Sequence, residues 1–296
     1  MTDLARFLER AEALLARVEV LLPPPAPNPD WSALAFRWRK RQGRGFLDAV
    51  RRPHRIRLDD LRAVEAQKAT IERNTRQFVA GRGANNVLLT GARGTGKSSL
   101  VKGVLNRFAD QGLRLIEVDK GDLVDVAEIV DLIAARPERF VMFCDDLSFE
   151  ANEPGYVAMK SVLDGSISGM PDNLLLYATS NRRHLMPEYM AENLEAKRVG
   201  DEIHPGETIE EKVSLSERFG LWLSFYPFDQ DQYLDICAHW LAEFGLGMKQ
   251  IAAARGEALQ WAMMRGSRSG RVAMQFARDY AGRIKPAPRV RSRDRA

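Results

Sequence analysis

Residues 87–100 read VLLTGARGTGKSSL, and this stretch constrains the fold more than any other part of the chain. An apolar run leads to Gly91, and four residues later come Gly96, Lys97 and Ser98. Glycine tolerates the backbone angles of a tight turn, so successive N–H groups of such a loop can point inward at an anion. A strand, this spacing and a helix together are typical of a phosphate-binding loop. The sequence therefore predicts these three elements in direct succession.

The residue types in this loop indicate ATP with Mg²⁺ as the ligand. Lys97 supplies a positive charge for the β and γ phosphates, and the Ser98 hydroxyl is a ligand for Mg²⁺. The helix that starts near Lys97 adds its positive N-terminal end. The predicted nucleotide-binding residues are Gly91, Ala92, Arg93, Gly94, Thr95, Gly96, Lys97, Ser98 and Ser99.

A second group of candidate residues follows the apolar run at residues 140–144, which ends in Asp145 and Asp146. Ligands of parallel sheets bind beyond the carboxyl ends of the strands, where both carboxylates would lie. We expect Asp145 to hold Mg²⁺ and Asp146 to orient or deprotonate the attacking water. The alternative is a strand end that is only capped by acidic residues.

Strand-like and helical patterns alternate from residue 85 onward, which predicts an α/β fold with a parallel sheet covered by helices. The predicted strands are Val87–Thr90, Leu113–Val118, Phe140–Cys144, Leu174–Thr179 and Leu221–Tyr226. No strand pattern remains between residues 229 and 283, so we expect a C-terminal helical lid there. The predicted divisions are an amphipathic helix (1–22), a Pro-rich and basic linker (23–55), the core (56–228), the lid (229–284) and a basic disordered tail (285–296).

The composition, with 45% hydrophobic and 28% charged residues, is that of a soluble globular protein. No apolar run is long enough to span a membrane, and charges interrupt the N-terminal segment where a secretory signal would be apolar. The two cysteines, Cys144 and Cys237, argue against a disulfide scaffold. We therefore expect a cytoplasmic protein without a membrane partner.

Two segments before the core suggest macromolecular partners. The apolar stripe of the helix at residues 3–22 must pack on the core or on another chain. Residues 37–57 carry many cations and the single acid Asp48, with aromatic residues interleaved. Cations with stackable rings suit single-stranded nucleic acid. The alternative is a solvated basic face whose aromatic side chains pack on the core.

The order of these parts resembles the AAA+ ATPases over about residues 56–283. The run 174–181, LLLYATSN, looks like their sensor 1 strand, with Asn181 near the γ-phosphate. The run 214–220, SLSERFG, looks like the segment with their arginine finger, which would be Arg218. Residues 270–273, GRVA, look like sensor 2, which makes Arg271 a catalytic residue, although Arg265 and Arg268 are nearby competitors for this role. Residues 57–68 resemble the segment that flanks the adenine.

Residues 84–102 look closer to one bacterial branch of predicted AAA+ proteins, a family of unknown function. Most AAA+ proteins have Glu after the Mg²⁺-binding Asp, whereas this chain has Asp146, as bacterial replication initiators and helicase loaders do. Its shorter side chain predicts a slow ATPase. An arginine finger acts across a subunit boundary, so the resemblance implies a homo-oligomer with Arg218 acting in trans. The alternative for Arg218 is a salt bridge within its own chain.

The resemblance implies an ATPase that uses hydrolysis to remodel or load a macromolecular partner, whose identity the sequence does not reveal. The alternatives are an ATP-dependent switch with little turnover, a nucleic-acid-associated ATPase like the helicase loaders, and a kinase acting on a small molecule. The kinase is disfavoured because no acceptor pocket is evident in the sequence.

Overall fold

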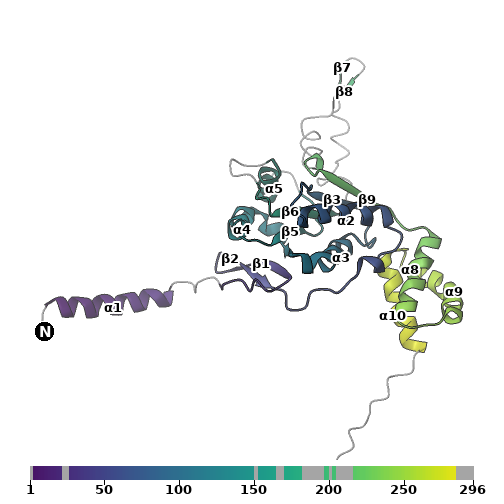
Figure 1. Cartoon of the computed structure of the whole chain (residues 1–296), viewed down its shortest axis with the longest axis horizontal. Helices are drawn as coiled ribbons and strands as arrows, with labels where there is room; N and C mark the ends of the chain where they lie inside the picture. The colour runs from purple at the N-terminus through teal and green to yellow at the C-terminus, as the bar shows by residue number, and fades with distance from the viewer. Residues whose placement is uncertain are drawn as a thin grey trace, which may run out of the picture.

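A computed structural model describes residues 3–21, 27–149, 153–164, 170–181, 197–199, 202–204 and 216–284. Its centre is a seven-stranded sheet in the order β2-β1-β4-β5-β6-β3-β9 (Figure 1). All neighbouring strands in it are parallel except β1 and β2. The five predicted strands are all present, as β3 (Val87–Gly91), β4 (Leu113–Glu117), β5 (Arg139–Cys144), β6 (Leu174–Ser180) and β9 (Leu221–Phe225).

The order of the strands brings the predicted site together. β3 lies between β6 and β9, and β6 also pairs with β5. The loop after β3, the carboxylates after β5 and Asn181 after β6 therefore follow strands that end at the same edge of the sheet. The predicted α/β fold with a parallel sheet is confirmed.

Two strands that the sequence did not predict lie within residues 23–55, where a linker was expected. β1 (Ala35–Arg41) and β2 (Arg44–Ala49) form an antiparallel hairpin, and β1 joins the sheet beside β4. The hairpin turn is Gln42-Gly43, where both residues have positive φ angles, of 51° and 78°. Such angles match the twist of a two-residue hairpin turn. Residues 35–49 are therefore part of the core fold and not a linker.

The aromatic side chains of this basic segment do not form a stacking surface for nucleic acid. Phe36 and Trp38 are fully buried, and Trp31 and Phe46 are partly buried. The Trp38 indole N–H donates to Asp125 at 2.9 Å and so ties the hairpin to the segment before α4. The aromatic side chains therefore pack on the core, as the alternative interpretation expects of them.

The sheet has a hydrophobic core on each face. On one face the core is formed with α2 (Glu65–Val79), α3 (Lys97–Phe108) and the C-terminal helices. On the other face it is formed with η3 (Lys120–Asp125), α4 (Val126–Ile133) and α5 (Pro154–Asp164). Two short 3-10 turns flank α3 in space or in sequence: η1 (Leu58–Asp60), whose Leu58 belongs to the first core, and η2 (Ala109–Gln111), which directly follows α3. The small hairpin of β7 (Lys197–Val199) and β8 (Glu202–His204) forms a separate sheet.

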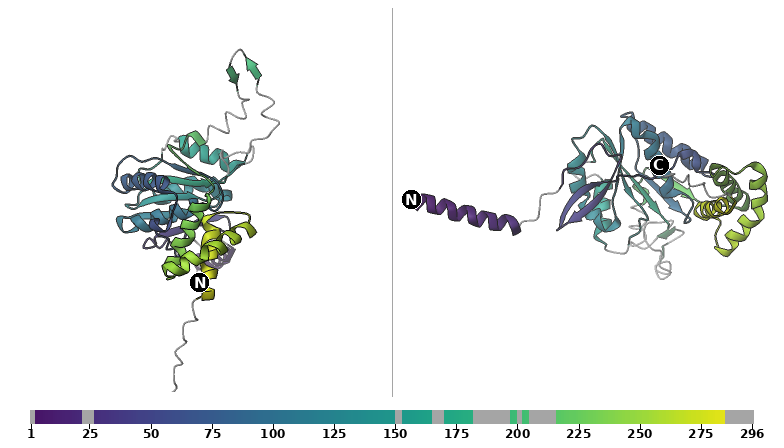
Figure 2. Two further views of the ribbon diagram at one scale, coloured as in Figure 1. Left: turned by 90° about the vertical axis from the view of Figure 1, so that its right-hand side faces the viewer. Right: turned by 90° about the horizontal axis from the view of Figure 1, so that it is seen from below.

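Three helices follow β9 and form the helical part that the sequence predicts. They are α8 (Gln230–Glu243), α9 (Met248–Met264) and α10 (Gly270–Ile284). They lie together at one end of the sheet in both sets of views (Figures 1 and 2). Asp229 caps α8 by accepting a hydrogen bond from the N–H of Gln232 at 2.8 Å. We call these three helices the lid.

The predicted N-terminal helix is α1 (Asp3–Leu21). It lies apart from the sheet, at the end of the molecule opposite the lid (Figure 2). Its apolar stripe is exposed, with Leu4, Phe7 and Leu15 all more than 60% accessible. None of the described helices is both long and apolar enough for a membrane span. The predicted tail, residues 285–296, lies outside the described residues.

Candidate nucleotide-binding site

The loop between β3 and α3 has the tight backbone that its glycines predict. Three of them have positive φ angles, of 120°, 76° and 100° respectively: Gly91, Gly94 and Gly96. Gly91 has no room for a side chain, because a Cβ atom there would lie 1.9 Å from the carbonyl oxygen of Phe225. The Thr95 hydroxyl donates to the Ala92 carbonyl at 2.8 Å. α3 begins at Lys97, so its positive end faces the loop.

Lys97 is a buried cation, with only 6% of its surface exposed. Its ammonium group donates to three uncharged oxygens: Gly91 O and Ala92 O, both at 2.8 Å, and Asn181 Oδ1 at 3.0 Å. Burial lowers the pKa of Lys97, and the nearby carboxylates of Asp145 and Asp146 oppose this shift. A buried charge is costly without a close counter-ion. A phosphate group bound at the loop would supply one.

Asp145 and Ser98 lie side by side, as expected for two ligands of one metal ion. The Ser98 hydroxyl donates to Asp145 Oδ1 at 2.6 Å, and the Thr179 hydroxyl donates to the same oxygen at 2.6 Å. Hydroxyl and carboxylate oxygens are the ligands that Mg²⁺ prefers. The donor set therefore fits Mg²⁺, with Thr179 orienting the carboxylate.

Asp146 is joined to Lys97 through one side chain. The Asn181 amide donates to Asp146 Oδ1 at 2.5 Å, while its oxygen accepts from Lys97. Asp146 has a positive φ of 55°, which is uncommon for a residue other than glycine. Its backbone N–H donates to the Thr179 hydroxyl at 2.9 Å, which helps to hold this conformation. Thr179 thus orients the Asp145 carboxylate and holds the backbone of Asp146.

A cleft of about 610 Å³ opens beside this network, between the core and the lid. Its volume lies within the range of small-molecule binding sites. On the core side it is lined by the loop residues 93–99 and by Asp145, Asp146, Thr179 and Asn181. The segment after β2 contributes His54, Ile56, Asp60, Leu61, Arg62 and Val64, and the lid and its connection contribute Phe228, Ile236, Trp240, Gly270, Arg271 and Met274.

The lid meets the phosphate loop at the first turn of α10. The N–H of Arg271 points to the Gly94 carbonyl at 3.4 Å, and Ser269 packs against the Gly94 backbone. Arg271 lines the cleft, whereas its predicted competitors do not: Arg265 stacks over Trp261 and Arg268 is exposed. Of the three arginines, which all belong to the described residues, only Arg271 lines the cleft.

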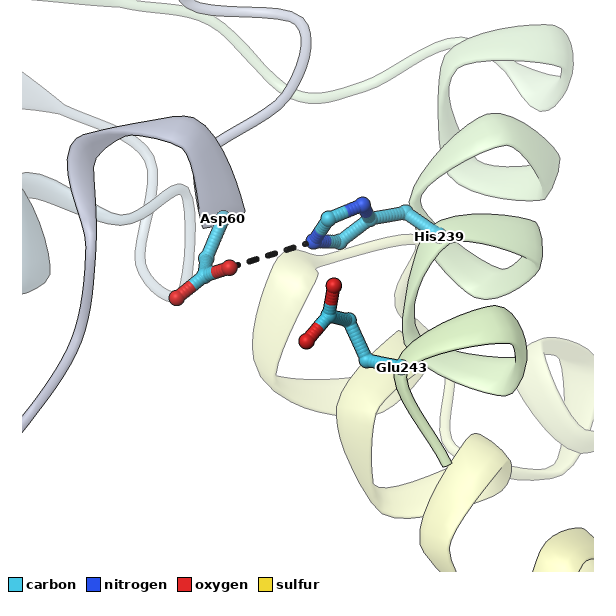
Figure 3. A group of neighbouring side chains, drawn as sticks. All are labelled: Asp60, His239 and Glu243. Carbon is cyan, nitrogen blue, oxygen red and sulfur yellow. Dashed lines mark ion pairs between the residues drawn. The ribbon is translucent and has the colours of Figure 1, made fainter. Parts of the chain in front are cut away.

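A second contact between core and lid lies at the other side of the cleft (Figure 3). His239 and Glu243 project from α8 toward Asp60 of η1, and His239 Nε2 lies 3.5 Å from Asp60 Oδ1. The Arg57 guanidinium pairs with Asp60 at 2.7 Å and with Glu243 at 2.8 Å. Burial raises the pKa of the Asp60 carboxyl, but the hydrogen bonds and charge of Arg57 outweigh this effect and lower it overall.

Comparisons with known proteins place the chain in a family. A family model described as "Protein of unknown function (DUF815)" matches residues 32–284. The chain belongs to the DUF815 family. No curated protein matches it. The predicted resemblance to a bacterial AAA+ family of unknown function is thereby confirmed.

Some solved structures are similar to this chain in fold. An Orc1 protein from Aeropyrum pernix, solved in complex with DNA, has a TM-score of 0.50 and 18% identity over 76% of this chain and 62% of its own. RuvB from Thermotoga maritima has a TM-score of 0.48 and 17% identity over 75% of this chain and 63% of its own. The DUF815 chain thus covers less than two thirds of either structure. The likeness to the Orc1 structure shows a shared fold, of the AAA+ type, and the fold alone.

Arg218 lies away from the cleft of its own chain. It precedes β9, whose first residue pairs with Val87 and whose last residue pairs with Gly91. At about 3.3 Å per residue, the length of β9 places Arg218 more than about 13 Å from the loop end of the sheet. Arg218 is partly buried and does not line the cleft.

Several residues at the site of this DUF815 protein were not predicted. The sequence predicts Thr179 only as part of a strand. Its position as a polar residue near the end of a strand, at the same edge of the sheet as Asp145, could have indicated a role at the site. The cleft residues Trp240, Ile236 and Met274 come from the lid, and helical periodicity does not indicate which apolar side chains face a ligand.

Proposed function

We propose that this DUF815 protein binds ATP in the cleft and hydrolyses it. The observation that carries the proposal is the hydrogen-bonded series from Lys97 through Asn181 to Asp146. It joins a buried cation at the phosphate loop to a carboxylate that lines the cleft. These are the groups that phosphoryl transfer to water requires.

The side chains divide the chemistry between them. Lys97 binds the β and γ phosphates. Asn181, which now accepts a hydrogen bond from Lys97, contacts the γ-phosphate. Asp146 orients the water or takes its proton. Mg²⁺, held by Ser98 and Asp145, would neutralise the charge that develops between the β and γ phosphates. Arg271 contacts the phosphates from the lid side.

The assay is phosphate release with ATP alone, measured beside the affinity for a fluorescent ATP analogue. Lys97→Ala should lose binding, whereas Asp146→Asn should keep binding and lose release. Asp48→Asn is the matched control, since Asp48 is an exposed carboxylate on β2. Unaltered release by the Asp146→Asn protein would refute the assigned role. Because Asp146 is shorter than Glu, we expect turnover below the ~10 s⁻¹ typical of enzymes.

A molecular switch is the second candidate, because Asn181 already engages Asp146 and can keep it from water. Tight ATP binding with negligible phosphate release would establish the switch in place of the ATPase. Phosphate transfer that needs a small-molecule acceptor would indicate a kinase instead.

The active form in this proposal is a homo-oligomer in which Arg218 reaches the site of a neighbouring copy. Its position at the far end of β9 supports this, because Arg218 does not line its own cleft. Lys97→Ala and Arg218→Ala proteins should each be inactive alone, and their mixture should recover part of the activity. A mixture as inactive as its components would contradict the trans arrangement, as would a monomer in light scattering with ATP and Mg²⁺.

The oligomer would couple ATP hydrolysis to the remodelling or loading of a macromolecular partner in the cytoplasm. The support is the lid, which contacts both the phosphate loop and the η1 segment and so can move when the nucleotide changes. Small-angle scattering with ATP and with ADP would detect this movement, and identical profiles would argue against it.

A further inference from the structure

We propose that the hairpin of β1 and β2 and the segment that follows it bind the phosphate backbone of double-stranded nucleic acid. Three cations of residues 37–57 are engaged by acids: Arg37 by Glu117, Lys40 by Asp122 and Asp125, and Arg57 by Asp60 and Glu243. The others are exposed and form no ion pair within the described part of the chain. We call them the basic band: Arg39, Arg41, Arg44, Arg51, Arg52 and Arg55.

The register of the hairpin gathers half of the band on one face. Arg41 lies directly opposite Arg44, and Arg39 lies opposite Phe46, so these side chains share a face. Like charges opposite each other on a strand pair are destabilising. A polyanion would remove this repulsion, whereas a solvated face leaves it in place.

The spacing and the chemistry of the band match a duplex backbone. Arg39 and Arg41 are two strand residues apart, which is about 6.6 Å along β1. Successive phosphates of one duplex strand are ~3.4 Å apart along the axis, so this spacing equals about two steps. Every cation of the band is an arginine, whose planar guanidinium binds phosphate in bidentate fashion.

The structure disfavours single strands and membranes as the ligand. Single-strand binding relies on exposed rings for stacking, and none of the four aromatic residues between positions 31 and 46 is exposed. Insertion into a bilayer requires exposed apolar side chains beside the cations. The hairpin carries none, because its apolar residues are buried or partly buried.

The band is also connected to the nucleotide cleft. After Arg51, Arg52 and Arg55, the same segment reaches Ile56 and Asp60, which line the cleft. The side chain of Asn106 on α3 donates to the His54 and Ile56 carbonyls, each at 2.8 Å. α3 itself begins at Lys97. We therefore expect ATP binding to change the affinity for the duplex, and the duplex to change the affinity for ATP by the same factor. This coupling rests on the proposed ATP site, whereas duplex binding itself does not.

The test measures the affinity of the full chain for a fluorescein-labelled duplex of random sequence as a function of salt. If all six arginines contact phosphates, affinity should fall about 10³-fold between about 50 and about 200 mM salt. The triple variant Arg39→Ala, Arg41→Ala and Arg44→Ala should bind the duplex more weakly. Its affinity should fall only about 40-fold over this salt range, because three phosphate contacts remain. Its thermal stability should not decrease, because the three side chains are exposed.

The matched control removes the same charge elsewhere, with alanine at three exposed arginines: Arg82, Arg255 and Arg278. This control should bind like the unaltered protein. Equal weakening of both triple variants would overturn the proposal, because only net charge would then matter. Tighter binding to a single strand or to phosphatidylserine vesicles than to the duplex would also overturn it.

Lys97→Ala separates this proposal from the proposed ATPase. The variant should bind the duplex normally without nucleotide and should lose any effect of ATP on duplex affinity. A second set, with alanine at Arg51, Arg52 and Arg55, should weaken duplex binding independently of the hairpin. If neither set changes the salt dependence, the band is a solvated face.

Discussion

The contact between Gly94 and the lid can be tested by adding a single methyl group. Gly94 has a φ of 76°, and a Cβ atom there would lie 2.8 Å from Ser269 Oγ and 2.9 Å from Ser269 Cβ. Ordinary van der Waals contact begins near 3.4 Å, so Ser269 must retreat by about half an ångström or more. Because Ser269 precedes α10, Gly94→Ala should push the lid away from the phosphate loop.

The cost has two separable parts. A left-handed residue with a side chain costs about 1–2 kcal/mol, and overpacking costs about 1–3 kcal/mol. Gly94→Ala should therefore lower the free energy of unfolding by about 2–5 kcal/mol. Displacing a catalytic group by about 1 Å can cost up to about 100-fold in rate, so ATP hydrolysis should fall steeply as Arg271 moves with the lid.

A second substitution distinguishes these parts. Ser269→Gly removes the two atoms that the new methyl would meet, and as a helix N-cap change from Ser to Gly it should cost only a few tenths of a kcal/mol. In the double variant the free energy of unfolding should rise again by the part lost to overpacking. The part lost to the left-handed conformation of residue 94 should remain lost. Urea unfolding and binding of a fluorescent ATP analogue measure both effects, with Gly83→Ala as control because a Cβ there meets nothing. No recovery in the double variant would refute the described packing.

Three further predictions follow from side-chain packing. Gly45→Ala should destabilise the protein by about 3 kcal/mol or more in urea unfolding, because its Cβ would lie 1.8 Å from the Trp38 ring. The lowered pKa of Asp60 contributes stability above its ordinary pKa of 3.8 that is lost as the pH falls below about 4; Asp60→Asn should flatten this part of the stability–pH curve. Burial raises the pKa of Cys144 and of Cys237 to about 12, so neither should react with a thiol reagent at pH 8 until the protein unfolds.

The convergence of the candidate site residues could be predicted because they lie next to the ends of strands. In a parallel sheet the carboxyl ends of the strands share one edge, so the loop at Lys97, the pair after β5 and Asn181 had to converge. Thr179 escaped prediction because threonine is common in strands for conformational reasons. Its role depends on the pairing of β5 with β6, which sets Cys144 opposite Ala178.

The hairpin was not predicted because its many charged residues favoured a linker, although its apolar residues alternate as in a strand. Phe36 and Trp38 alternate with arginines, and Gln42-Gly43 follows, which is the pattern of a strand and a tight turn. An alternation of only two apolar residues is a weak signal among so many cations. The Trp38 ring packs directly over Gly45. This contact depends on the pairing of the two strands, so it cannot be seen in the sequence.

Besides the shared hydrophobic core, several contacts between core and lid lie around the candidate nucleotide cleft. Ser269 packs on the phosphate loop, Arg57 bridges Asp60 to Glu243, and a longer ion pair joins Arg62 to Asp235 at 3.4 Å. Arg57, Arg62, Asp235 and Glu243 are largely exposed, and exposed ion pairs contribute little stability. These ion pairs therefore add little to the hydrophobic core that the lid shares with the sheet, and a nucleotide that contacts both the loop and α8 would strengthen the attachment on this side. If the cleft binds ATP as proposed, ATP binding and lid position are linked equilibria, and each biases the other by the same factor.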